Sequence, residues 1–99
     1  MRAIWHGEIV AEAAREELVR IEGNWYFPPS SVRDGALAES ATPYTCPWKG
    51  VAQYWDIRSG AGLPDGAWSY PHPFDGAADR VGREFAGYVA FDPRVTIEE

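Results

Sequence analysis

Short apolar runs separated by turn-forming residues make up most of the chain. Turn pairs such as His6-Gly7, Lys49-Gly50 and Asp75-Gly76 recur at short intervals, and the runs between them are rich in aromatic and β-branched residues. This pattern is typical of a mainly-β domain with short strands. We expect strands at about residues 2–5, 8–12, 18–21, 24–27, 52–57, 67–70, 88–91 and 95–97.

One stretch, residues 10–21, fits either a helix or strands. Val10, Ala14, Leu18 and Ile21 fall at helical spacing, and the residues between them are good helix formers. Against a helix, His6-Gly7 lies between two runs that contain apolar residues, where a tight hairpin would place it. We expect strands here, with a helix as the alternative.

A short helix is predicted near the C-terminal third, over residues 76–85. Ala77, Ala78, Val81 and Phe85 would form its apolar stripe, and Asp75 is available as the N-cap.

Length and composition restrict the class of protein. Ninety-nine residues suit a single compact domain, and a chain that is 45% hydrophobic can form a packed core. Fifteen acidic against nine basic residues give a formal charge of −6, which argues against a nucleic-acid partner. We expect Glu12, Glu16, Glu17 and Glu22 to form a solvated acidic face.

No targeting or membrane-spanning segment is apparent in the sequence. The N-terminal MRAIWHGEIV lacks the apolar stretch of a signal peptide, and no apolar run reaches the length of a membrane span. We therefore expect a cytoplasmic protein that does not contact a membrane.

The segment 45–55 is the densest in unusual residues, since it holds the only cysteine, the only lysine and two of the five tryptophans. Its order C-P-x-K-G-x-A-x-Y-W, followed by A-W-x-Y-P and Y-V-A-F, resembles the bacterial domain of unknown function 427 (DUF427). G-E-I-V-A near the start and W-Y-F-P before the middle agree with this resemblance, which covers nearly the whole chain.

The resemblance implies one β-rich domain over residues 1–99, similar to the coiled-sheet tent folds, with no established activity. A nucleotidyltransferase-like label is sometimes attached to the family. The residues do not support it, because the chain has no D-x-D or D-x-E pair to hold Mg²⁺ and no phosphate-binding glycine-rich loop. His72 also departs from the family, which has an acidic residue in Y-P-D-P.

Cys46 and Lys49 are the candidate catalytic residues. A lysine three residues from a thiol, across a turn that contains proline, could stabilise the thiolate and activate it as a nucleophile. The alternative is that Cys46 is a small core residue. Lys49 could instead bind an anionic ligand group, or it could be a solvated turn lysine.

The two histidines do not by themselves define a site. His6 is expected in a hairpin turn and His72 in a loop, although a Cys/His pair would form if His72 folded back near Cys46. Two histidines, one cysteine and no clustered carboxylates are a weak ligand set, so we predict no metal and no cofactor.

Aromatic residues of two segments, 45–55 and 67–73, suggest a ligand pocket. Aromatic walls bind flat or cationic ligands, although rings in so small a domain are often simply core. Strand alternation places Tyr54 and Trp55 on opposite faces, so that both cannot line one cavity without a bulge. The candidate ligand-binding residues are Thr45, Trp48, Tyr54, Trp55, Trp68, Tyr70 and His72.

Three functional hypotheses follow. The leading one is a small-molecule-binding domain whose aromatic pocket presents Lys49 to an anionic or carbonyl group. The alternative is an enzyme, a hydrolase or transferase of a small metabolite that uses Cys46 or Lys49. The third is a protein-interaction module with exposed aromatic side chains.

Overall fold

The chain folds into short antiparallel strands with one short α-helix, which confirms the predicted mainly-β class. In a computed structural model that describes residues 1–99, 42% of the residues lie in strands and 11% in helices. The strands are β1 (Arg2–Trp5), β2 (Glu8–Glu12), β3 (Val19–Ile21), β4 (Asn24–Tyr26), β5 (Leu37–Glu39), β6 (Thr45–Cys46), β7 (Gly50–Val51), β8 (Gln53–Ile57), β9 (Leu63–Ser69), β10 (Val89–Phe91) and β11 (Thr96–Glu98).

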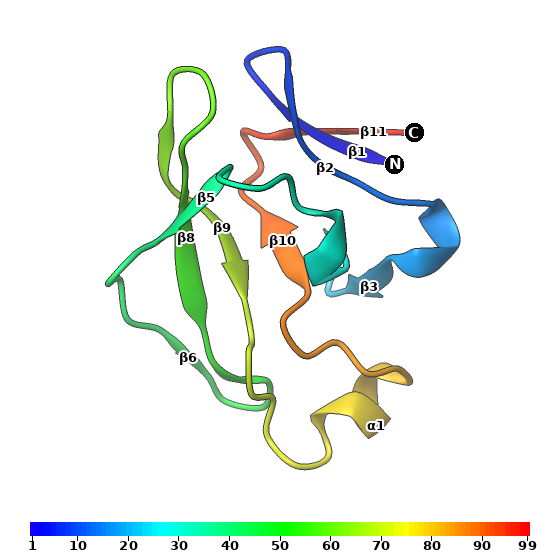
Figure 1. Cartoon of the computed structure of the whole chain (residues 1–99). Coiled ribbons are helices and arrows are strands. Elements are labelled where there is room, and N and C mark those ends of the chain that lie inside the picture. The colour runs from blue at the N-terminus through cyan, green and yellow to red at the C-terminus, as the bar shows by residue number, and fades with distance from the viewer.

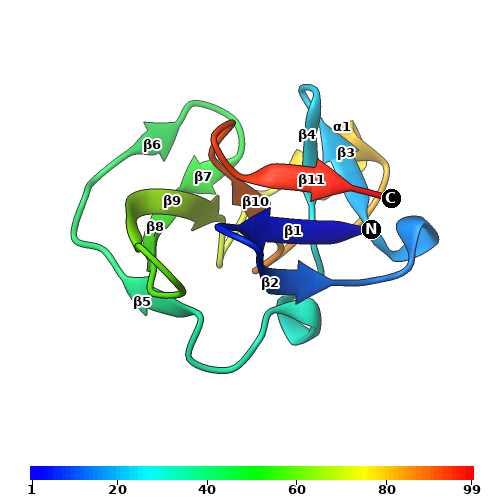
Figure 2. The ribbon, with the colours of Figure 1, turned by 90° about the horizontal axis from the view of Figure 1, so that it is seen from above.

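A three-stranded sheet joins the two ends of the chain, in the order β11-β1-β2. Figure 2 shows these strands side by side, with the two termini close together. The β1–β2 hairpin turns at His6 and Gly7, whose φ angles are 49° and 78°. Two successive positive φ angles are the geometry of a two-residue hairpin turn, so the hairpin predicted at His6-Gly7 is confirmed.

A four-stranded sheet in the order β10-β9-β8-β5 is the largest sheet, and we call it the central sheet. Figure 1 shows β5 and β8 on the left and β10 towards the middle. Two two-stranded sheets, β3-β4 and β6-β7, accompany the central sheet. An isolated bridge between Phe27 and Val89 continues β4 towards β10.

Strand alternation divides the apolar side chains between two core clusters, one on each side of the central sheet. Val89 and Phe91 of β10 belong to the first cluster, whereas Ala90 belongs to the second. Trp55 packs on the first cluster and Tyr54 on the second. The prediction that Tyr54 and Trp55 point to opposite faces is therefore confirmed.

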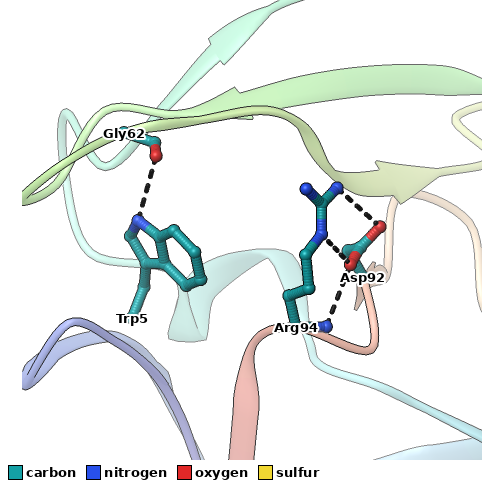
Figure 3. Close-up of polar contacts among 4 residues, drawn as sticks. All are labelled: Trp5, Gly62, Asp92 and Arg94. Carbon is teal, nitrogen blue, oxygen red and sulfur yellow. Dashed lines mark hydrogen bonds and ion pairs between the residues drawn. The ribbon is translucent and has the colours of Figure 1, made fainter.

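Polar contacts connect the three-stranded sheet to the rest of the molecule (Figure 3). The Trp5 indole N–H donates to the Gly62 carbonyl at 3.2 Å, next to the start of β9. Asp92, directly after β10, accepts from both the backbone N–H and the Nε–H of Arg94 at 2.9 Å. The Asp92–Arg94 bonds hold the turn by which the chain passes from the central sheet to β11, and the Trp5–Gly62 bond joins β1 to the start of β9.

The ambiguous stretch 10–21 contains strands and no α-helix. It ends β2, makes one 3₁₀ turn at Arg15–Glu17, and then forms β3. Val10 and Leu18 are buried in the first cluster, while Val19 and Ile21 are buried in the second. The apolar residues of this stretch are therefore spaced as they are because two separate clusters bury them, and not because they form one stripe of a helix.

The predicted helix is present but shorter than expected. α1 spans Ala77–Val81, and its N-cap is Gly76 in the left-handed region rather than Asp75. Gly82, also left-handed, ends the helix after little more than one turn. Phe85 is still fully buried, but it reaches the core from the segment that follows the helix. No helix is long and apolar enough to cross a membrane.

Candidate functional site

The β6–β7 hairpin carries Cys46 at the end of β6 and Lys49 in its turn. Cys46 pairs with Gly50 across the turn, which lies at the end of the central sheet away from the termini (Figure 1). Gly50 has a φ of 128°, and a Cβ atom built on it would lie 3.2 Å from the His72 carbonyl oxygen. The Phe74 N–H also donates to the Lys49 carbonyl at 3.0 Å. Segments 45–55 and 67–73 therefore converge, as the pocket hypothesis requires.

Lys49 is almost completely buried, with only 6% of its side chain exposed. Its ammonium group forms an ion pair with the Glu22 carboxylate, which comes from the β3–β4 turn. The alternative interpretation of Lys49 as a solvated turn lysine is thus wrong. Glu22 is exposed, as expected for the solvated acidic face, and it also pairs with Lys49. A lysine is rarely buried unless it is paired.

Two aromatic rings surround the Lys49 ammonium group. Its nitrogen lies 4.8 Å from the ring centroid of Trp48 and 5.4 Å from that of Tyr70. The guanidinium carbon of Arg80 lies 4.4 Å from the same Trp48 centroid. Two cations therefore lie against the same Trp48 ring, in a chain whose formal charge is −6.

The ion pair keeps Lys49 charged despite its burial. Burial lowers the pKa of Lys49, but the hydrogen bond to Glu22 and the nearby acidic groups raise it by more. The net pKa therefore lies above its ordinary value of 10.5. A permanent ammonium group suits the binding of an anion better than it suits proton transfer near neutral pH.

Cys46 is a buried thiol that lies beside Lys49. Burial raises the pKa of the thiol, but the backbone N–H groups of Trp48 and Lys49 and the Lys49 ammonium group lower it by more. The net pKa lies below the ordinary value of 9.0. The core interpretation and the proximity of Cys46 to Lys49 are therefore both correct.

Tyr26 is a member of this cluster that the sequence analysis missed. The indole N–H of Trp68 donates to its hydroxyl oxygen at 3.0 Å, and burial raises the pKa of Tyr26. Tyr26 and Glu22 belong to β4 and its preceding turn, more than twenty positions before Lys49. No local pattern links these segments, because a tertiary contact brings them together.

The remaining predicted site residues are divided. Tyr54 and Trp68 pack on the second core cluster, which also contains Cys46, whereas Thr45, Trp55 and His72 do not. Tyr54 packs beside Trp68, with ring centroids 6.3 Å apart, while Thr45 and His72 are exposed. No hydrogen bond joins His72 to Cys46. Trp55 donates its indole N–H to the Ser69 hydroxyl at 3.0 Å, on the face of the sheet away from the Lys49 cluster.

An open cleft of about 370 Å³ lies next to Trp48. Phe74 and Arg80 also line it, together with Asp75. A second hollow, of about 230 Å³, lies between Val51 and His72. The predicted aromatic residues therefore do not line one enclosed cavity. Trp48 lines the 370 Å³ cleft, whereas Trp55 lines a different pocket.

Three large apolar side chains are exposed around the β6–β7 hairpin, namely Tyr44, Val51 and Phe74. Main-chain hydrogen bonds hold their segments together, from Ala52 to Tyr44 and from Phe74 to Lys49. The interaction-module hypothesis needs a patch of this kind, and it stays a prediction.

No group of three or more His, Cys, Asp or Glu side chains gathers where it could hold a metal ion. The polar cluster around Lys49 contains one thiol, one carboxylate and phenolic hydroxyls, and the ammonium group occupies its centre. A bound cation there would meet a like charge.

The fold and this cluster define a small mainly-β domain built around a buried, ion-paired lysine. The chain belongs to the family described as a domain of unknown function (DUF427), whose match covers residues 1–99. The resemblance seen in the sequence motifs is thus confirmed. No curated protein matches the chain.

Proposed function

We propose that this protein binds a small molecule whose anionic or carbonyl group is received by Lys49. The observation that carries the proposal is the buried ammonium group, whose carboxylate partner comes from an exposed hairpin turn. Burying a charge is costly, and a packed core does not require one. A buried lysine at the meeting point of three hairpin and loop segments is better suited to recognition than to stability.

Glu22 occupies the position that a ligand carboxylate would take. Its own side chain is 57% exposed, so water and salt weaken its hold on Lys49. A ligand that brings its own anionic group can replace Glu22 without leaving the ammonium group unpaired. The carboxylate would then return to solvent at little cost.

The aromatic rings supply the surface for the rest of the ligand. Trp48 borders both the Lys49 ammonium group and the open cleft, and Phe74 forms another wall of that cleft. The cleft is also lined by Arg80, which has no ion-pair partner, and by Asp75. An aryl carboxylate or phosphate would match this combination of rings and cations.

A ligand screen tests the proposal. Thermal-shift assays with a fragment library that contains aryl carboxylates, phosphates and carbonyl compounds should identify stabilising anions. In calorimetric titrations, Lys49→Met should remove the binding of each hit, and Glu22→Gln should tighten it.

Arg20→Met is the matched control, since Arg20 also stacks on a tryptophan, Trp25, but lies outside the cluster. It should leave binding unchanged. The proposal fails if the library contains no stabilising anion, or if Lys49→Met binds the hits as well as the unmodified protein does.

The second candidate is a hydrolase or transferase that uses Cys46 or Lys49, and the lowered pKa of the Cys46 thiol favours it. An activated ester such as p-nitrophenyl acetate would acylate the thiolate and release p-nitrophenolate. Cys46→Ser should abolish that release while leaving the unfolding transition nearly unchanged. Equal release by both proteins would exclude the enzyme hypothesis for this thiol.

A further inference from the structure

We propose a second ligand site, for a small zwitterion with an apolar side group, such as an apolar α-amino acid. It is an open pocket of about 300 Å³, and the residues that carry the argument are Pro29, Arg33, Asp34, Leu37, Trp55 and Val89. We call it the Arg33–Trp55 pocket. It shares no residue with the Trp48 cleft and lies on the other side of the central sheet.

The base of the pocket is apolar and comes from the central sheet. Trp55 lies on β8, Leu37 on the neighbouring β5, and Val89 on β10. The hydrogen bond from the Trp55 indole to Ser69 sets the orientation of the ring. A ring held in this way can receive an apolar or aromatic group without losing side-chain entropy on binding.

The rim of the pocket carries one charge of each sign. Arg33 and Asp34 are consecutive, both are exposed, and neither side chain makes a hydrogen bond or ion pair within the protein. Main-chain bonds hold their turn, from Arg33 N–H to the Val10 carbonyl at 2.8 Å and from Ala36 N–H to the Arg33 carbonyl at 3.1 Å. The main chain of this turn is therefore held in place, and the two charged side chains are free to contact a ligand.

This arrangement selects the ligand by charge. A guanidinium group binds a carboxylate with two parallel hydrogen bonds, and the Asp34 carboxylate can accept from an ammonium group. A simple anion would be repelled by Asp34, and a simple amine by Arg33. Glu12 also lies near Arg33, but its carboxylate is already hydrogen-bonded to Arg2. A zwitterion satisfies both free charges while its side group covers the Trp55 ring.

The volume agrees with a ligand of amino-acid size. Pockets for drug-sized molecules begin at about 300 Å³, so this one suits a small molecule that leaves part of its surface in water. The binding is expected to be weak and fast, because both charged residues are exposed.

Nuclear magnetic resonance tests the site with named probes. Phenylalanine should shift the Trp55 indole N–H and the backbone N–H signals of residues 33–37 in a saturable way. 3-Phenylpropionate lacks the ammonium group, and phenethylamine lacks the carboxylate, so each should bind at least about tenfold more weakly. Glycine, which has no side group, should bind more weakly than phenylalanine.

Charge-neutralising variants identify the groups. Arg33→Gln and Asp34→Asn should each weaken phenylalanine binding about tenfold. Arg20→Gln and Asp79→Asn are matched controls at exposed positions outside the pocket, and they should change nothing. Lys49→Met should also leave the shifts intact, so the two sites can be judged separately.

Either of two results would overturn the inference. One is the absence of saturable shifts at Trp55 up to the solubility limit of phenylalanine. The other is equal binding of phenylalanine and 3-phenylpropionate, which would show that Asp34 takes no part in recognition.

Discussion

At the scale of single residues, the chemistry of this domain centres on Lys49. Its ammonium group is buried, its carboxylate partner is exposed, and a thiol and phenolic hydroxyls are close to it. The asymmetry between the two partners matters, because replacing one of them has a different physical consequence from replacing the other.

Replacing Glu22 should destabilise the fold more than replacing Lys49. Glu22→Gln leaves a buried ammonium group without a counter-charge, and we expect it to lower the free energy of unfolding by about 1 kcal/mol, because the pair is only partly buried. Lys49→Met keeps most of the side-chain packing and removes the charge, so its effect should be smaller. Urea denaturation measures both values.

Glu16→Gln, at an exposed position, is the matched control and should change the free energy of unfolding little. A larger loss for Lys49→Met than for Glu22→Gln would contradict the prediction and show that the ion pair contributes chiefly to folding.

The Cys46 thiol should ionise below its ordinary pKa of 9.0, because backbone N–H groups and Lys49 stabilise the thiolate. Ultraviolet absorbance of the thiolate follows this titration without a reagent having to reach the buried sulfur, and Cys46→Ser supplies the baseline. Lys49→Met should move the apparent pKa upwards. An unchanged apparent pKa in that variant would show that the ammonium group does not act on the thiol.

At the scale of elements, the β6–β7 turn depends on a conformation that only glycine adopts readily. Gly50 has a φ of 128°, and an added Cβ atom would approach the His72 carbonyl oxygen to 3.2 Å. The absence of a side chain at this position therefore favours the close approach of Lys49 and Phe74.

Gly50→Ala should lower the free energy of unfolding by about 2–3 kcal/mol, from backbone strain and from the contact with a backbone oxygen. Gly82→Ala is the matched control, since Gly82 also has a positive φ, of 91°, but an added Cβ atom there meets nothing within 4 Å. It should cost about 1 kcal/mol. Thermal or urea unfolding compares the two variants, and equal losses would show that the close approach to His72 is unimportant.

The pattern of aromatic and β-branched residues predicted some strands and missed others. Strands with aromatic and β-branched residues, such as β4, β8 and β10, lie within the predicted ranges. Strand β5 (Leu37–Glu39) and the two-residue strands β6 and β7 were missed. They form because a neighbouring strand supplies hydrogen-bond partners, and a short segment carries too few residues to show a period.

At the scale of the whole molecule, several buried groups respond to alkaline pH in the same direction. Burial raises the pKa values of Tyr26, Tyr54 and Tyr70 above the ordinary value of 10.0, and the pKa of Lys49 lies above 10.5. Above pH 10 the unfolded chain therefore binds fewer protons than the folded chain. Stability must then fall as the pH rises.

The free energy of unfolding should accordingly decrease from about pH 10 upwards, as measured by urea denaturation at each pH. Tyr70→Phe should reduce that decrease, because it removes one buried group that ionises more easily in the unfolded chain. Tyr44→Phe, at an exposed position, is the matched control. A stability that is constant over this pH range would contradict the prediction.

The sequence by itself determined the mainly-β class, the hairpin at His6-Gly7, the short helix and the family, and it singled out Cys46 and Lys49. Each of these depends on local spacing or on motifs along the chain, which the order of residues expresses directly. Strand alternation likewise separated Tyr54 from Trp55 correctly.

Only the tertiary structure decided that Lys49 is buried and that Glu22 and Tyr26 belong to its surroundings. It also placed Trp55 with Arg33 and Asp34 in a separate pocket. These contacts join segments far apart in the chain, and their geometry depends on how the sheets pack. Packing is a property of the whole set of side chains, so no local pattern of residues could have shown it.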